Sequence, residues 1–115
     1  MELQQAQQMA ISLLRFHGLH DYKFSYLRAM GKFSRAGQCN WKKKIISLAP
    51  FFVKWNSPFV VKQTILHEIA HALTPRHGHN KFFQKMASEI GHIATCSGRH
   101  THYGKHVNRK PPRQR

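Results

Sequence analysis

The residues of this chain that are best suited to chemistry lie in the segment HEIAH, residues 67–71. Residues four positions apart on a helix lie on nearly the same face, so His67 and His71 can bind one cation together. Glu68 lies about 100° further around the helix axis, where its carboxylate reaches a water molecule more readily than the cation. This pattern is typical of metal-assisted hydrolysis, in which Zn2+ lowers the pKa of water and a carboxylate accepts the proton.

The pentapeptide HExxH also occurs in helices that bind no metal. Two observations favour a metal site in this chain. Apolar residues on both sides of the motif would bury the rest of the helix, and further histidines follow after Thr74 and Pro75 end it. These apolar residues are Ile65, Leu66, Ile69 and Leu73.

A catalytic zinc site needs a third protein ligand, and two histidines are candidates. His77 lies six residues after His71, which matches the spacing HExxHxxGxxH, but Thr74 occupies the position of its glycine. His79 would lie at the start of the next helix, where Phe83 can pack against it. We therefore predict that His79 completes a site for one Zn2+ ion, and we keep His77 as the alternative.

Hydrophobic periodicity predicts an α+β fold. Alternation over residues 22–26 and β-branched residues within 39–48 predict strands, which we expect to form a small antiparallel sheet. This sheet would pack against an N-terminal helix and the HEIAH helix, which Ser57 can cap and Pro58 can begin. A C-terminal helix follows. The predicted helices are 2–16, 58–73 and 80–91, with a helical turn in 51–56 and a turn region at 31–37.

The composition changes after residue 96, where the chain becomes basic and contains no acid. We therefore assign residues 1–96 to one domain and residues 97–115 to a flexible tail. The tail has no hydrophobic support for a metal site, so its histidines are not expected to bind a specific ion. These histidines are His100, His102 and His106.

The sequence has the features of a soluble, intracellular protein. It contains no run of 18 apolar residues and no secretory signal, so no membrane partner is expected. Cys39 and Cys96 form no CxxC pair and no disulfide framework, and each is predicted to be a small buried side chain. We expect a monomer in the cytoplasm of a bacterium or of a phage-infected cell.

Three segments together resemble the SprT-like metalloprotease family. The family pattern is HExxH, a variable connection, then Gly-His followed four residues later by an aromatic residue, which HEIAH, residues 78–79 and Phe83 match. Upstream, AGQCNWKKKIISLA resembles the family's Gly-x-Cys, basic run and strand. Downstream, MASEIGHIATC resembles the segment after the third ligand. The resemblance covers about residues 5–96.

The resemblance implies a zinc peptidase that cleaves proteins bound or crosslinked to DNA, with activity stimulated by nucleic acid. It implies His67, His71 and His79 as zinc ligands and Glu68 as the catalytic base. Many family members continue into a zinc ribbon with paired cysteines, whereas this chain has only Cys96 in that region. The expectation of DNA binding therefore depends on the charge of the chain.

That charge is strongly positive: 19 Lys and Arg against four Asp and Glu give a formal net charge of +15. Such an excess favours a polyanionic partner, most commonly nucleic acid. Trp41 beside basic residues could stack on bases of single-stranded or damaged DNA, although it could equally lie in the core, which is the favoured place for Trp55. The predicted nucleic-acid contacts are Arg28, Lys32, Arg35, Lys42, Lys43, Lys44, Arg99, Lys105, Arg109 and Lys110.

Two other functions fit part of this pattern. A metal-dependent RNA hydrolase can also use three histidines, but it has no acid after the first, so Glu68 favours a peptidase. A non-catalytic nucleic-acid-binding module could use zinc only to brace its fold. Within the peptidase interpretation, Tyr103 and Arg76 are candidates to stabilise the oxyanion.

Overall fold

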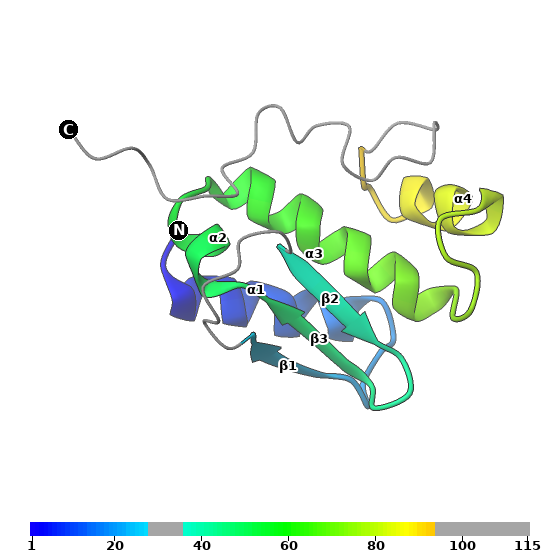
Figure 1. Cartoon of the computed structure of the whole chain (residues 1–115), viewed down its shortest axis with the longest axis horizontal. Coiled ribbons are helices and arrows are strands. Elements are labelled where there is room, and N and C mark those ends of the chain that lie inside the picture. Colours follow the sequence, from blue (N-terminus) through cyan, green and yellow to red (C-terminus); the bar gives the residue numbers. More distant parts are fainter. Residues whose placement is uncertain (28–35, 94–115) are drawn as a thin grey trace.

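The computed structural model describes residues 1–27 and 36–93. It shows an α+β fold, which confirms the predicted class (Figure 1). Helix α1 packs against strand β1 and helix α3, α3 packs against β2 and β3, and helix α4 packs on α3. The elements in chain order are α1 (Leu3–Phe16), β1 (Lys23–Tyr26), β2 (Gly37–Asn40), β3 (Ile45–Leu48), α2 (Pro50–Lys54), α3 (Pro58–Leu73) and α4 (Lys81–Glu89).

The sheet is mixed, which corrects the prediction that it is antiparallel. The strand order is β1-β3-β2, with Phe24 of β1 opposite Ile46 in a parallel pair and Cys39 of β2 opposite Ile46 in an antiparallel pair. Side-chain alternation indicates which face of a strand is buried, but it carries no information on the direction of the neighbouring strand. Of the two strand pairs, only β2 and β3 are antiparallel, and the alternation in the sequence could not show this.

The basic run KKK forms a turn, so the predicted strand 39–48 is in fact a hairpin. Asn40 Oδ1 accepts a hydrogen bond of 3.0 Å from the backbone N–H of Lys43. Lys44 closes the turn with a positive φ of 59°, in the left-handed region. Its ammonium group forms an ion pair with Asp21, which ties the hairpin to the segment between α1 and β1. The predicted turn at 31–37 lies mostly outside the described residues, and Gly37 itself begins β2.

Helix α3 has the predicted bounds because its ends carry the expected signals. Ser57 Oγ accepts a hydrogen bond of 3.4 Å from the backbone N–H of Val60, and Pro58 occupies the first helical position. At the other end, Thr74 Oγ1 donates a hydrogen bond of 2.7 Å to the carbonyl oxygen of Ala70. The helix that carries HEIAH therefore begins and ends at residues with identifiable capping roles.

Buried residues of the helices and the sheet form one continuous core around α3. Its largest fully buried side chains are Phe52, Ile46, Leu48, Ile65, Ile69, Val53 and Val61. A smaller cluster on another side of α3 joins Ala70 to Phe83 and Ala87 of α4. Within the described parts of the chain, no helix is both long and apolar enough to cross a membrane. Helix α3 thus holds the sheet and α4 in a fixed relation to each other.

The core around α3 can be tested with two substitutions on the same helix. Ile65 is fully buried, so Ile65→Ala should lower the free energy of unfolding by about 2–5 kcal/mol. Phe59 is 58% exposed, so Phe59→Ala should change it by no more than about 0.5 kcal/mol. Urea unfolding followed by circular dichroism measures both values. Equal effects of the two substitutions would contradict this packing.

Candidate metal centre

Three histidine side chains converge at the end of α3. His67 and His71 project from α3, and His79 comes from the loop that leads into α4. The Nε2 atom of His79 lies 3.3 Å from Nε2 of His67 and 3.0 Å from Nε2 of His71. Three nitrogen ligands at the corners of a zinc tetrahedron would be about 3.3 Å apart, because each Zn–N bond is about 2.0–2.1 Å. The donor set therefore fits a zinc ion, and this group could hold a metal.

The phenyl ring of Phe83 supports all three imidazoles. Its centroid lies 5.0 Å from that of His67, 4.4 Å from that of His71 and 5.0 Å from that of His79. Phe83 is 3% exposed, so the contact is made in the interior. The sequence predicted its packing against His79, but the structure extends this contact to the two histidines on α3.

Helix α4 begins directly after His79 and fixes the backbone of this ligand. Asn80 Oδ1 accepts hydrogen bonds from the backbone N–H groups of Phe82 at 3.0 Å and Phe83 at 3.2 Å. Gln84 Nε2 donates a hydrogen bond of 3.1 Å to the carbonyl oxygen of His79. The helix ends at Glu89, earlier than the predicted residue 91. Its first turn therefore both positions His79 and delivers Phe83 to the centre.

His77, the alternative third ligand, lies outside this cluster. Its ring stacks on Phe82 with centroids 4.8 Å apart, and its Nδ1 atom is 3.2 Å from Nδ2 of Asn80. The chain turns between the two histidines at Gly78, whose φ of 62° is in the left-handed region. The structure thus brings His79, and not His77, to the pair on α3.

Burial favours the protonation state that a metal ligand needs. Desolvation lowers the pKa of His79 below its ordinary value, which favours the neutral imidazole with a free electron pair. His67 is only 5% exposed. A divalent cation at this position would therefore be surrounded by protein on the side of α3.

The carboxylate of Glu68 turns toward strand β2 and is 7% exposed. A Cβ atom at Gly37 would lie 3.3 Å from Glu68 Oε2 and 3.2 Å from both Leu48 Cδ2 and the carbonyl oxygen of Ser47. Glycine therefore permits the close approach of β2 to the acid. The Gly-x-Cys pattern in the sequence pointed to Gly37, although the sequence alone could not show that this glycine makes room for Glu68.

The thiol of Cys39 lies near the same acid and stays protonated. Burial, followed by the negative charge of Glu68, raises its pKa to about 12. It shares a hydrogen bond with the hydroxyl group of Tyr22, whose own pKa is raised mainly by burial. Cys39 is half-buried, close to the prediction of a small buried side chain, while Cys96 lies outside the described residues. A protonated thiol of this kind is neither a nucleophile nor a metal ligand.

Two buried polar residues near the centre were missed by the sequence analysis. The imidazole of His92 is 4% exposed and its centroid lies 5.4 Å from that of His67. Gln63, which is 5% exposed, accepts through Oε1 a hydrogen bond of 2.8 Å from the backbone N–H of Ile93. Together they hold the segment after α4 against α3. Their spacing carries no motif, and only the match of MASEIGHIATC to the family pattern pointed to this segment.

The predicted nucleic-acid contacts are only partly described by the structure. Lys42 and Lys43 are exposed in the β2–β3 turn, and Lys44 forms the ion pair with Asp21. Trp41 is half-buried in this turn with Arg76 over its ring, and Trp55 packs against Phe51 with centroids 5.1 Å apart. The remaining predicted contacts and Tyr103 lie outside the described residues: Arg28, Lys32, Arg35, Arg99, Lys105, Arg109 and Lys110.

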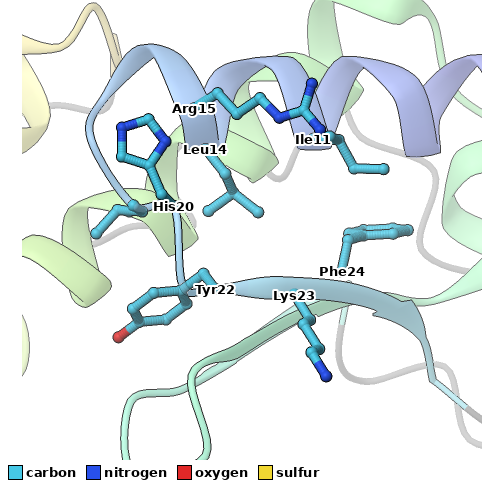
Figure 2. A pocket seen from close by; sticks show the side chains of 8 residues that line it. Ile11, Leu14, Arg15, His20, Tyr22, Lys23 and Phe24 are labelled. Carbon is cyan, nitrogen blue, oxygen red and sulfur yellow. The ribbon is translucent and has the colours of Figure 1, made fainter.

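A separate hollow of about 350 Å3 lies between α1 and β1. Leu14 of α1 and Phe24 of β1 project into the space between the two elements (Figure 2). Arg15, His20 and Lys23 also line it, whereas none of the three clustered histidines does. The basic character of the molecule therefore continues on a face that is distinct from the candidate metal centre.

An HExxH helix whose third histidine comes from the following loop is the arrangement of the zincin class of metal-binding domains. A sequence model of the SprT-like family matches residues 7–106. Because this match covers most of the 115 residues, the chain belongs to the SprT-like family. The match continues past residue 96 into the segment predicted as a tail. No curated protein and no solved structure matched the chain.

The assignment of the third ligand can be tested by comparing two neighbouring histidines. His79→Ala removes one corner of the cluster, so zinc affinity should fall by more than the roughly 10- to 100-fold typical of losing a residue that only supports a ligand. His77→Ala should leave the affinity within about twofold, because His77 stacks on Phe82 instead. Competition with a chromophoric chelator measures both. Loss of zinc in the His77 variant alone would reverse the assignment.

Proposed function

We propose that this protein is a zinc-dependent peptidase. The observation that carries the proposal is the buried carboxylate of Glu68, which directly follows His67 in a three-histidine cluster fit for zinc. Membership of the SprT-like family supports it, because this family resembles the HExxH metalloproteases in its motif. A zinc site that only stabilises the fold has four protein ligands with no open position, and it does not require an acidic residue beside them.

The residues of the chain have separate roles in this reaction. His67, His71 and His79 would hold the zinc ion, which when bound lowers the pKa of water and polarises a carbonyl group. Glu68 accepts a proton from the attacking water and delivers it to the leaving amine. Gly37 leaves room for this carboxylate between α3 and β2.

Strand β2 offers a surface for the substrate. Among the described strands it lies at one edge of the sheet and pairs with β3 alone. An extended peptide can add to such an edge through backbone hydrogen bonds, which require no particular side-chain sequence. Because β2 also borders Glu68, a peptide added there would run past the catalytic acid. This arrangement suits a peptidase that accepts many unfolded or exposed segments.

We further propose that the substrates are proteins bound or crosslinked to DNA. The net charge of +15 supports a nucleic-acid partner. Lys42 and Lys43, which are exposed at the tip of the β2–β3 hairpin next to the edge strand, offer cations for phosphates. Single-stranded DNA bound at this tip would bring a protein attached to it close to β2.

The catalytic role of Glu68 can be tested by a substitution that keeps its shape. Glu68→Gln should retain zinc, since the three histidines are unchanged, but should reduce cleavage of an unfolded protein attached to single-stranded DNA by about 10²- to 10⁴-fold. Fragments separated by electrophoresis report the rate, and elemental analysis reports the metal. Glu89→Gln removes an exposed carboxylate on α4 and serves as the matched control. Unchanged cleavage by the Glu68→Gln variant, or cleavage of RNA instead of protein by the parent, would overturn the proposal.

The nucleic-acid surface predicts a defined dependence of binding on salt. Each phosphate contact to a single strand contributes about 0.7 to the slope of log K against log salt concentration. Replacing both Lys42 and Lys43 with Ala should therefore lower this slope by about 1.4, as measured by fluorescence anisotropy. The control replaces two exposed lysines elsewhere, Lys54 and Lys62, with Ala and removes the same charge. An equal decrease of this slope in the two double variants would show that binding depends only on net charge and not on these two lysines.

A further inference from the structure

The tip of the β2–β3 hairpin touches the loop between α3 and α4. The guanidinium carbon of Arg76 lies 5.0 Å from the centroid of the Trp41 ring, a cation–π contact. Lys42 Nζ lies 5.6 Å from the same ring. The hairpin and the loop lie at the same end of the molecule, where α3 finishes (Figure 1). One indole therefore joins two segments that are far apart in the sequence.

The backbone of Arg76 is held in an unusual conformation. Its φ of 72° lies in the left-handed region, which residues with a side chain rarely adopt. Gly78, two residues later, also has a positive φ of 62°. These two positions turn the chain between the end of α3 and His79. A glycine would fit position 76 with less strain, which makes a role for the arginine side chain worth testing.

The two joined segments hold different parts of the proposed metal centre. Strand β2 lies against the carboxylate of Glu68 at Gly37, and the hairpin turn with Trp41 follows this strand directly. The loop carries His79 three residues after Arg76, and residues 75–78 of this loop are exposed. The loop that carries His79 is therefore in contact with the hairpin that continues β2.

We propose that the contact between Arg76 and Trp41 is a latch that fastens the α3–α4 loop to the β2–β3 hairpin and so positions His79 relative to β2 and to the two histidines of α3. The inference rests on the proposed metal centre. Arg76 and Trp41 are positioning residues, because they act on the centre through the loop and the hairpin. Without the latch, zinc must order the loop when it binds, which weakens binding.

The size of the effect follows from the strength of an exposed cation–π contact. Such a contact changes an equilibrium by about two- to fivefold. Arg76→Ala and Trp41→Leu should each weaken zinc binding by about this factor, and the double variant should be no weaker than either single variant. Arg15→Ala removes an exposed arginine at the end of α1 and should leave zinc affinity unchanged. Additive losses, or no loss in the single variants, would overturn the latch.

Substitution of Arg76 by Gly distinguishes the contribution of the side chain from that of the backbone conformation. Arg76→Gly relieves the left-handed backbone but removes the guanidinium group, so the latch predicts weaker zinc binding, as in Arg76→Ala. A role of the backbone alone predicts unchanged or tighter binding. Arg76→Lys and Trp41→Phe retain a cation and a ring, so each should restore most of the affinity. Failure of both conservative variants to do so would also count against the latch.

A second measurement reports on the latch without any metal. In a Trp55→Phe background, Trp41 is the only tryptophan, because the chain has two. Arg76→Ala should then increase quenching of its fluorescence by acrylamide, whereas Arg15→Ala should not. Unchanged quenching would overturn the latch even if zinc affinity fell.

The outcomes separate the latch from the proposed function. If the parent protein bound no zinc, both inferences would fail. If the variants behaved as expected while no protein substrate was cut, the latch would stand and the peptidase would not. If cleavage depended on Glu68 but the zinc affinity was the same in the parent and in the Arg76 and Trp41 variants, only the latch would fail.

Discussion

The convergence of three imidazole nitrogens at a single point is the constraint on which the rest of the structure depends. His67 and His71 share one face of α3, but the third nitrogen comes from a loop and must be brought to within 3.0–3.3 Å of theirs. This requires α3 to stop at Thr74, the loop to reverse at Gly78 and α4 to start at Asn80. Each of these local signals has a direct consequence for the centre.

The sheet contributes the other half of the arrangement. Strand β2 approaches α3 closely because Gly37 has no side chain, and the carboxylate of Glu68 occupies the space beside it. The hairpin that contains β2 is in turn tied by Lys44 to Asp21, before β1. In a chain with only four acidic residues, one therefore borders β2 beside Gly37 and another is paired with the hairpin that contains this strand.

The parts of this arrangement that the sequence could predict are those governed by local rules. Ser57 and Pro58 marked the start of α3, and the spacing of HEIAH indicated which side chains share a face. The direction of β1 depends on long-range pairing, and the placement of His92 against His67 depends on packing after α4, so neither leaves a local signal. The contact of Arg76 with Trp41 joins two loops, and no periodicity could reveal it.

Phe83 gives the centre a property beyond its geometry. A single buried ring touches all three imidazoles, and it belongs to the small cluster that docks α4 on α3. In the proposed metal centre this ring restrains the three ligands together, so a substitution that loosens the docking of α4 on α3 is expected to speed metal exchange.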